Sequence, residues 1–389
     1  MQIKANRLNV FQKSVFTELK ELKEEYTKRT GNKVIDFSIG SPNIAPKKSI
    51  METLQNAVMV DENWKYAINE LPELKEAVKE WYKNRYEADL EDDEIIALQG
   101  SQEALSTIFM ATCNPGDVVL IPDPYYPIFC DGPRLAGADI EFMPLLEEND
   151  YLIQLDKIDP EILKRTKIMI VSYPNNPTCA IAPDSFYEEL IQFAKKNNII
   201  ILHDNAYSEL LFDGRIGKSF LSFEGAKEVG IELNSFSKTY GMAGARLGVC
   251  VGNKDVLEAY RILKSNMDYG IFLPVQYAGI EALKNGGDSI VPTRMAYEHR
   301  RDILVKYFKE AGWNIPLSPA TMFSWCRIPD HYEDSYTFTK DLLEKTGVVV
   351  TPGQSFGKEG IRYVRLALVQ DEKDIMEAAC RIKESGLFQ

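Results

Sequence analysis

The stretch that decides the fold is SFSKTYGMAGAR, which runs from Ser235 to Arg246. It continues an apolar run, so Lys238 stands at the end of a strand that we expect to be buried, where a bare ammonium group is costly. That cost disappears if the nitrogen is tied up as an imine with an aldehyde. The two serine hydroxyls just before Lys238, together with the planar guanidinium of Arg246, suit a phosphate group. The alternative is a solvated loop lysine among polar neighbours.

Around this stretch, short apolar runs alternate with helical stretches from about Glu94 to Val251. The runs are rich in Ile and Val and continuously apolar, which is typical of strands buried on both faces. They are Ile95–Gln99, Val118–Pro122, Ile140–Leu145, Ile168–Tyr173, Ile199–His203, Ile231–Ser235 and Gly248–Val251. The helices expected between them are Ser101–Thr112, Ser185–Asn197 (opened by a Ser185-x-x-Glu188 capping box) and Asp255–Ser265. This alternation predicts an α/β layer with a mostly parallel central sheet.

The pattern changes after Thr293 and predicts a separate, smaller α+β unit. Its expected elements are a helix at Thr293–Ala311, a strand at Met322–Ile328, a helix at Ser335–Lys345 stopped by Gly347, strands at Val348–Thr351 and Tyr363–Val369, and a last helix ended by Gly386. We therefore expect a large domain over residues 48–285 and a small domain over 286–389, with residues 1–47 packing against the small domain.

Composition excludes several classes of protein. The chain has 389 residues, of which 45% are hydrophobic and 26% charged, as in an ordinary globular protein. A net charge of −13 argues against a nucleic-acid partner. No apolar run approaches the roughly 20 residues that span a bilayer, and no secretory signal opens the chain, so we expect a cytoplasmic protein without a membrane partner. Six scattered cysteines and three distant histidines predict neither disulfides nor a metal site.

The Lys238 stretch resembles the Schiff-base motif of fold-type-I pyridoxal-phosphate enzymes, specifically the class I/II aminotransferases. The resemblance covers nearly the whole chain and is strongest for the aspartate and LL-diaminopimelate aminotransferase-like branch. It implies the type I fold of PLP-dependent transferases, with a seven-stranded sheet, pyridoxal 5'-phosphate (PLP) as cofactor, and a homodimer with shared active sites. Lys238 then carries PLP and acts as the general base at the substrate Cα. Ser235, Ser237 and Arg246 hold the phosphate.

Two further motifs follow predicted strands. The sequence Pro174–Thr178 is similar to the family's N-P-T motif, which implies a hydrogen bond from Asn176 to the cofactor oxygen O3′; the alternative is a proline-rich turn. Asp204 lies at the carboxyl end of a parallel strand, where open α/β sheets bind ligands. There it can pair with the protonated pyridine nitrogen. Tyr207 resembles the tyrosine that contacts O3′. The alternative for Asp204 is a helix N-cap.

Two turns complete the expected cofactor site. Ser101 and Gln102 lie at a strand-to-helix turn, where backbone N–H groups favour an anion, and the resemblance makes them phosphate ligands. In the segment Asp123–Pro127 the family's stacking aromatic corresponds to Tyr126, with Tyr125 as the competing assignment.

The resemblance assigns three residues to the substrate and to a second subunit. Arg365 suits a bidentate pair with the substrate α-carboxylate, whereas Arg362 is expected to be solvated. Gly40 resembles the glycine that borders the substrate, next to Asn176. Tyr66 matches the tyrosine that reaches the phosphate of the neighbouring subunit, although Glu70 stands near the position where the family usually has glycine.

These residues predict transamination between amino acids and 2-oxo acids, within amino-acid metabolism. The main alternative is a PLP-dependent C–S β-lyase of the cystathionine type, which shares the same cofactor contacts. A non-enzymatic regulator is a weaker alternative, because an appended DNA-binding region has no room before Val34. An aspartate or LL-diaminopimelate type of substrate fits the resemblance. The sequence alone does not identify a second arginine or lysine for a dicarboxylate side chain, nor an acidic group for a distal ammonium.

Overall fold

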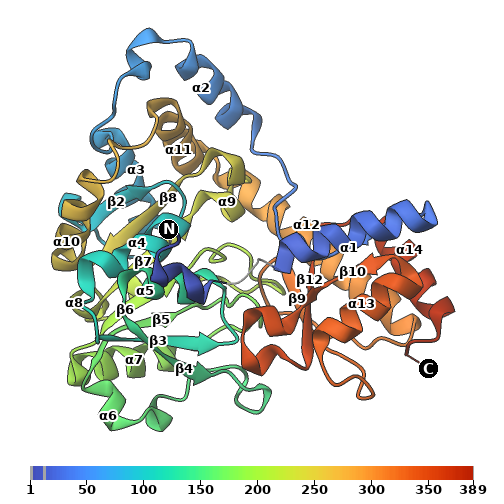
Figure 1. The fold of residues 1–389 in the computed structure, drawn as a ribbon. Helices are drawn as coiled ribbons and strands as arrows, with labels where there is room; N and C mark the ends of the chain where they lie inside the picture. The colour runs from blue at the N-terminus through green and yellow to red at the C-terminus, as the bar shows by residue number, and fades with distance from the viewer. Residues whose placement is uncertain (1–2, 12–14, 389) are drawn as a thin grey trace.

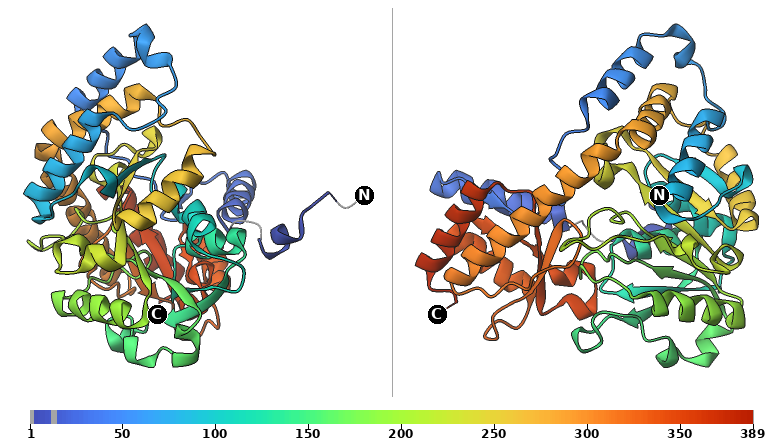
Figure 2. Two further views of the ribbon diagram at one scale, coloured as in Figure 1. Left: turned by 90° about the vertical axis from the view of Figure 1, so that its left-hand side faces the viewer. Right: turned by 180° about the vertical axis from the view of Figure 1, so that it is seen from behind.

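The computed structural model describes residues 3–11 and 15–388 (Figure 1). One lobe is built around a central sheet with helices on both faces, and a smaller lobe combines short strands with helices (Figures 1 and 2). The six cysteines are all free thiols. No helix in the described part of the chain is long and apolar enough to pass through a lipid bilayer.

The central sheet has seven strands in the order β2-β8-β7-β6-β5-β3-β4. β8 pairs antiparallel with both of its neighbours, whereas the other neighbouring pairs are parallel. The strands are β2 (Ile95–Leu98), β3 (Val118–Asp123), β4 (Asp139–Pro144), β5 (Thr166–Val171), β6 (Ile200–Asp204), β7 (Gly230–Ser235) and β8 (Gly248–Gly252). Each overlaps one of the seven apolar runs, so the predicted α/β class and the mostly parallel seven-stranded sheet are confirmed.

Six of the seven strands are buried on both faces, because successive strand residues point to opposite sides and helices cover both. The edge strand β4 is mostly exposed, so the expectation of burial on both faces was wrong for the run at Ile140–Leu145. In β2, Ile95 and Ala97 belong to one apolar cluster, while Ile96 and Leu98 belong to another. The helices that bury the first face are α3 (Pro72–Tyr86), α7 (Asp184–Asn197) and α11 (Leu273–Asn285), and those on the second are α4 (Gln102–Thr112), α5 (Ile128–Ala136) and α10 (Lys254–Ser265). The remaining helices of this lobe are α2 (Lys48–Val58), which packs on α11, and the one-turn α6 (Pro160–Leu163), α8 (Ala226–Val229) and α9 (Phe236–Thr239).

The smaller lobe holds a three-stranded antiparallel sheet in the order β11-β12-β9 and a two-stranded parallel pair, β1 with β10. Its elements are α1 (Val15–Thr30), β1 (Ile35–Asp36), α12 (Gly287–Glu310), β9 (Phe323–Arg327), α13 (Ser335–Thr346), β10 (Val348–Val349), β11 (Thr351–Pro352), β12 (Tyr363–Ala367) and α14 (Glu372–Ser385). One apolar cluster packs most of these elements together, and a smaller one packs α1 against α13 and β10. Segments from both chain ends thus share one lobe.

Three local predictions were wrong. α7 begins at Asp184 after Pro183 and has no side-chain cap, so the Ser185-x-x-Glu188 capping box does not form. α12 begins at Gly287 instead of Thr293, because Pro292 removes one helical hydrogen bond without ending the helix. The run predicted as one strand at residues 348–351 divides into β10 and β11, because its two halves pair with different strands.

Two helix ends were predicted correctly. Gly347 follows α13 and Gly386 follows α14, each with a φ of 69°. This left-handed conformation suits glycine, which lacks a Cβ.

Candidate active site

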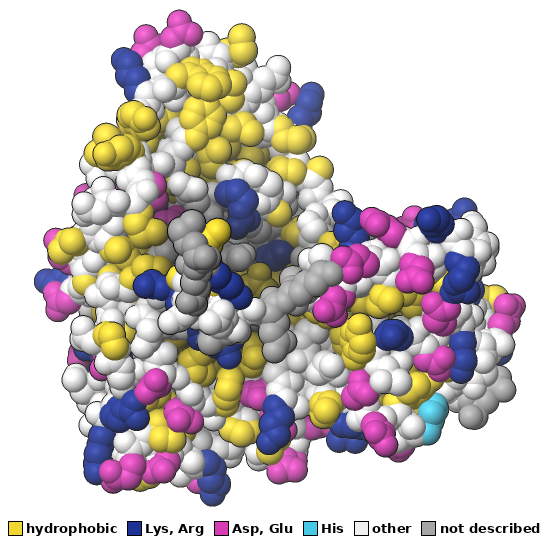
Figure 3. Space-filling model, in the orientation of Figure 1, with side chains coloured by type: hydrophobic (Ala, Val, Ile, Leu, Met, Phe, Trp, Pro, Cys, Tyr) yellow, Lys and Arg dark blue, Asp and Glu magenta, His cyan; other side chains and the backbone are white. Residues whose placement is uncertain are grey.

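The carboxyl ends of the parallel strands meet at one edge of the large sheet, and a cavity of about 710 Å³ opens there. β8 runs in the opposite direction, so its beginning, just after Arg246, lies at the same edge. The predicted site residues that line the cavity are Gly40, Ser101, Gln102, Tyr126, Asn176, Asp204, Tyr207, Ser235, Ser237, Lys238, Arg246 and Arg365. Tyr66 is the predicted site residue that lies elsewhere. Figure 3 shows dark blue side chains around a central hollow.

Lys238 lies in α9, the one-turn helix that directly follows the carboxyl end of β7. The hydroxyl of Ser235 accepts a hydrogen bond from the Ser237 backbone N–H at 3.2 Å and so caps α9. The Lys238 Nζ donates to the carbonyl oxygen of Gly40 at 3.3 Å. Gly40 has no room for a side chain, since a Cβ there would lie 2.7 Å from the Phe323 ring. The lysine nitrogen therefore points into the cavity, next to the Gly40 backbone, which packs closely on the Phe323 ring.

Two buried charged groups in the cavity have atoms without hydrogen-bond partners. Asp204 ends β6 and is 7% exposed, and within the described residues its Oδ1 has no partner. Arg365, from β12, donates from Nη1 to Asn176 Oδ1 at 2.8 Å, while its Nε is unpaired in the same part of the chain. Its guanidinium lies over the rings of Phe323 and Phe356, at 4.1 and 4.6 Å from their centroids. A buried polar atom without a partner is costly, so both groups are suited to a ligand.

Arg246 and two glycines form a cradle at the other end of the cavity. A Cβ at Gly100 would lie 2.5 Å from the Arg246 guanidinium, and one at Gly248 would lie 2.9 Å from the Ser101 backbone nitrogen. The Arg246 guanidinium therefore packs directly on the Gly100 backbone, just before α4 begins. Exposed N–H groups at a helix start, next to an arginine, are a typical site for a phosphate group.

Comparison with known proteins identifies the family. The sequence profile described as "Aminotransferase class I and II" matches residues 32–382. The chain belongs to this family. It is 42% identical over 385 residues to the LL-diaminopimelate aminotransferase of Halothermothrix orenii, covering 98% of both chains. It is 41% identical over 382 residues to the enzyme of the same name from Natranaerobius thermophilus, covering 97% of this chain and 98% of that one.

Solved structures agree with this assignment. Substrate-bound BacF from Bacillus subtilis superposes with a TM-score of 0.96 at 34% identity, covering 100% of this chain and 99% of that one. A probable N-succinyldiaminopimelate aminotransferase from Thermus thermophilus gives 0.90 at 32% identity, covering 96% and 100%. The protein is thus an aminotransferase of the aspartate and LL-diaminopimelate branch, its cofactor is PLP, and its reaction is transamination rather than the β-lyase alternative.

The cavity residues of this aminotransferase fit the cofactor. PLP has an anionic phosphate, a basic ring nitrogen and an aldehyde. The cavity offers the Arg246 cradle, the unpaired carboxylate oxygen of Asp204 and the Nζ of Lys238. In residues 3–11 and 15–388, no cluster of three or more His, Cys, Asp or Glu side chains is arranged to hold a metal ion.

Burial shifts the pKa values of the charged groups in the cavity. Burial, together with the positive charges of Arg365 and Arg246, lowers the pKa of Lys238 to about 8. Burial raises the pKa of Asp204 to about 6, against the opposing effects of His203, of a hydrogen bond from the Ala206 backbone N–H and of Lys238. Burial also raises the pKa of Tyr207, which keeps its hydroxyl proton available as a hydrogen-bond donor. These shifts leave Asp204 ionised and a large fraction of Lys238 neutral in mildly basic solution.

A second buried polar group lies within the sheet, on the face covered by α3 and α7, and sequence reasoning did not identify it. Glu232 of β7 is fully buried and accepts four hydrogen bonds. The donors are Tyr82 Oη at 2.9 Å, Ser219 Oγ at 3.0 Å, the Phe220 backbone N–H at 2.7 Å and His203 Nδ1 at 3.1 Å. His203 was expected to have a packing or supporting role, and it lies here, next to Asp204 in the chain. Glu232 gave no sequence signal, since a single Glu within an apolar run does not reveal its partners.

The two competing assignments lie outside the cavity. Tyr125 stacks on Phe142 with ring centroids 5.5 Å apart, whereas Tyr126 lines the cavity. Arg362 bonds the backbone carbonyl of Tyr332 and pairs with the exposed Asp330 at 3.4 Å.

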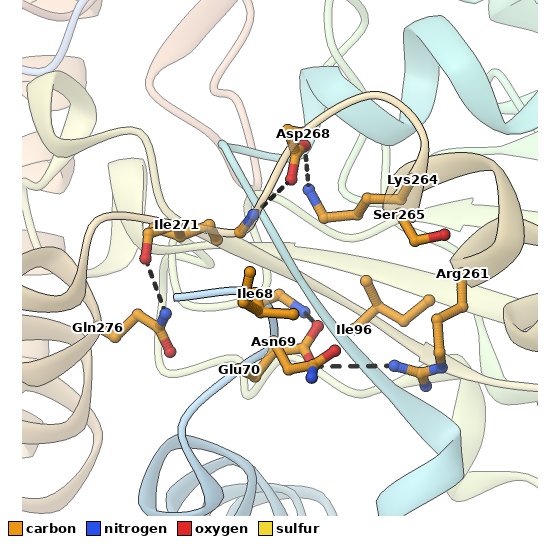
Figure 4. Close-up of a pocket in the computed structure, with 12 residues that line it drawn as sticks. Ile68, Asn69, Glu70, Ile96, Arg261, Lys264, Ser265, Asp268, Ile271 and Gln276 are labelled. Atoms are coloured by element: carbon orange, nitrogen blue, oxygen red, sulfur yellow. Dashed lines mark hydrogen bonds and ion pairs between the residues drawn. The ribbon is translucent and has the colours of Figure 1, made fainter. Parts of the chain in front are cut away.

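Tyr66 lies on an exposed surface and not in the cavity of its own chain. It is 78% exposed, and its ring contacts Tyr269 at a centroid distance of 5.3 Å. Beside this segment, Glu70 accepts a hydrogen bond from the Ala97 backbone N–H of the edge strand β2 at 3.0 Å. Glu70, Arg261 and Lys264 border a second cavity of about 30 Å³, which has room for water but not for a substrate (Figure 4).

Other residues that line the main cavity were missed. Phe323 contacts Gly40, Tyr207 and Arg365, and Lys20 and Lys23 reach the cavity from α1. None of these carries a motif, because their positions depend on contacts between segments that are distant in the sequence.

Proposed function

We propose that this aminotransferase moves the amino group of an LL-diaminopimelate or aspartate type of amino acid to a 2-oxo acid, in amino-acid biosynthesis. The names of its relatives support this substrate class. The observation that carries the assignment of the site is the convergence of Lys238, Arg365 and the unpaired Oδ1 of Asp204 in one cavity.

We assign the predicted site residues to the cofactor or to the substrate, and Asn176 to both. Ser101, Gln102, Ser235, Ser237 and Arg246 would hold the phosphate of PLP; Tyr126 and Asp204 would hold the ring; Asn176 and Tyr207 would contact O3′; and Arg365, Asn176 and Gly40 would bind the substrate. When bound, PLP supplies an electron sink for charge that develops at the substrate α-carbon. The Asp204 carboxylate would pair with the ring nitrogen and so keep that sink effective.

Lys238 is the residue that we propose attaches the cofactor and moves the proton. Its lowered pKa of about 8 provides a neutral amine, which can act as a nucleophile and as a base near neutral pH. Arg365 fixes the α-carboxylate with a planar fork, already oriented by its bond to Asn176 at 2.8 Å. Fixing the carboxylate orients the α-proton toward the lysine.

We further propose a homodimer with shared active sites in the cytoplasm. An apolar surface surrounds Tyr66, and its exposed members are Met59, Val60, Trp64, Ile68, Met267, Tyr269 and Phe272. A patch of large exposed side chains favours burial against another protein surface. A second copy would bury it and carry Tyr66 to the phosphate of its partner. Six free thiols favour a reducing compartment. Residues 48–285 would then form the PLP-binding domain, and residues 286–389 with 1–47 the small domain.

A half-reaction screen tests this proposal. Each candidate amino acid is mixed with the PLP-loaded protein, and loss of the cofactor absorbance is followed without an oxo-acid acceptor. We expect LL-diaminopimelate or aspartate to give the fastest loss, accompanied by release of the matching 2-oxo acid. A protein that reacts with neither, or that forms pyruvate from cystathionine without an acceptor, would contradict it.

A further inference from the structure

Two lysines from α1 line the cavity, in addition to the cations already assigned. The basic side chains that line it are Lys20, Lys23, Lys238, Arg246 and Arg365. Asp204 is the only carboxylate residue that lines it within the described part of the chain. α1 lies along the smaller lobe with its first turns toward the middle of the molecule (Figure 1). The cavity therefore has more positive charge than its cofactor and an α-carboxylate require.

Lys23 is already neutralised by the protein. Its Nζ lies 2.5 Å from Asp36 Oδ2, and both side chains are largely buried, at 17% and 21% exposed. Asp36 also accepts hydrogen bonds from the Ser38 backbone N–H and hydroxyl, at 2.8 and 2.6 Å. This pair fastens α1 to the segment that leads to Gly40. Lys23 thus holds the helix in place but offers little charge to a ligand.

Lys20 is one turn earlier on the same face of α1 and is not neutralised in this way. Its carboxylate partner among the described residues is Glu24, at 3.8 Å, and the two side chains are 72% and 67% exposed. A pair of this length between exposed groups is weak. The ammonium group of Lys20 is therefore available to a second anion at the mouth of the cavity.

We propose that Lys20 binds the side-chain carboxylate of a dicarboxylic amino-acid substrate. This inference rests on the proposed function, in which Arg365 binds the α-carboxylate and Arg246 the phosphate. Among the described residues, those assignments leave Lys20 as the cation that lines the cavity with only a weak ion pair of its own. It supplies the second cationic group that the sequence alone did not identify. Because Lys20 is exposed, its contribution is screened by salt and shows mainly in KM.

The experiment compares Lys20→Ala and Lys20→Glu with Lys28→Ala, which removes an exposed lysine of α1 that does not line the cavity. The PLP-loaded proteins are assayed with aspartate and with alanine. Glutarate, a dicarboxylate without an amino group, is titrated against each protein, and its Kd is measured from the cofactor absorbance. This Kd does not depend on turnover.

We expect Lys20→Ala to raise the KM for aspartate and the Kd for glutarate by about tenfold, which corresponds to about 1.4 kcal/mol. The alanine kinetics and the Lys28→Ala variant should change less than about twofold. Lys20→Glu should weaken both dicarboxylates further, and added salt should reduce the difference.

Three results would overturn the assignment of Lys20: unchanged dicarboxylate binding in both variants, an equal loss for aspartate and alanine, or wild-type protein without any preference for dicarboxylates. A wild-type protein that transaminates neither aspartate nor LL-diaminopimelate contradicts the proposed substrate class instead. The two failures are therefore distinguishable.

Discussion

His203 and Asp204 are consecutive residues of β6, yet their side chains lie in opposite chemical surroundings. His203 lies on the face of the sheet covered by α3 and α7, where the Glu232 carboxylate accepts four hydrogen bonds and each of its oxygens has a donor. Asp204 faces the cavity, where its Oδ1 has no partner within the described residues and burial raises its pKa to about 6. One strand thus separates a polar group that stabilises the fold from one that is suited to a ligand.

This difference separates two kinds of buried charged group: one that stabilises the fold and one that is suited to bind a ligand. A buried charge surrounded by donors of its own chain contributes to stability, because every donor would be unpaired without it. A buried charge without such donors destabilises the unliganded protein and gains its partner only on binding. The four predictions below test the two sides of β6 against each other.

The largest effect is expected at Lys238. We expect Lys238→Ala to reduce kcat for transamination by about 10⁴-fold or more, because the variant lacks both the attachment point for PLP and the base. Initial rates with purified protein measure this, and Lys254→Ala, an exposed lysine of α10, is the matched control. Transamination retained by Lys238→Ala would refute the assignment of the cavity.

Removal of Glu232 should have the largest effect on stability. Glu232→Ala leaves four buried donors without an acceptor, so we expect the free energy of unfolding to fall by about 3–5 kcal/mol. Glu232→Gln should lose less, since the amide oxygen still accepts from His203 and the Phe220 backbone. Chemical denaturation measures both, with the exposed Glu258→Ala as control. A loss below about 1 kcal/mol in Glu232→Ala would show that the network is not structural.

Asp204→Asn should change stability in the opposite direction. The pKa of Asp204 is raised from 3.8 to about 6, so the folded protein binds the proton more tightly than the unfolded chain. The stabilisation from this proton is complete below pH 3.8 and is lost as pH rises through about 6. A shift of about two units corresponds to about 3 kcal/mol.

Without cofactor, Asp204→Asn should therefore be more stable than the wild type by about this amount at pH 7, and the gain should shrink toward about pH 4. Denaturation of the cofactor-free proteins at the two pH values measures the difference. We expect the same variant to bind PLP more weakly. If the stability difference between Asp204→Asn and the wild type were the same at both pH values, the raised pKa of Asp204 would be contradicted.

The smallest effect concerns the pH dependence of cofactor attachment. Since the pKa of Lys238 is lowered to about 8, the neutral amine fraction rises as pH passes through that value. The rate of PLP attachment to cofactor-free protein should rise over the same range and then level off. Arg365→Leu removes a positive charge, so the midpoint should move to higher pH. Stopped-flow absorbance measures both, and an unshifted midpoint would argue against electrostatic coupling between the two residues.

Local sequence patterns predicted much of this protein because they act over short distances. Seven runs gave seven strands, and six of these are buried on both faces, where continuous apolar residues are required. The edge strand β4 formed as well, although most of its residues are exposed. Motifs that follow these strands, such as Asn176 and Asp204, gathered in one cavity because parallel strands end at the same edge. The domain boundaries and the roles of the site residues stay predictions.

The failures have a different physical origin. The capping box at Ser185 was wrong because α7 begins one residue earlier, and a cap depends on the first turn alone. The start of α12 was misplaced because a proline inside a helix removes only one hydrogen bond. In both cases the error lies in the residue at which the helix begins, a choice that local preferences leave nearly balanced.

The sequence by itself determined the order of strands along the chain and the motif residues that follow them. Only the tertiary structure brought Gly40 to Lys238, 198 residues away, and Arg365 to Asn176, 189 residues away. It also turned Lys20 toward the cavity and enclosed Glu232 among four donors. Secondary structure follows from periodicity within a few residues, whereas these contacts depend on how distant segments pack around a shared core.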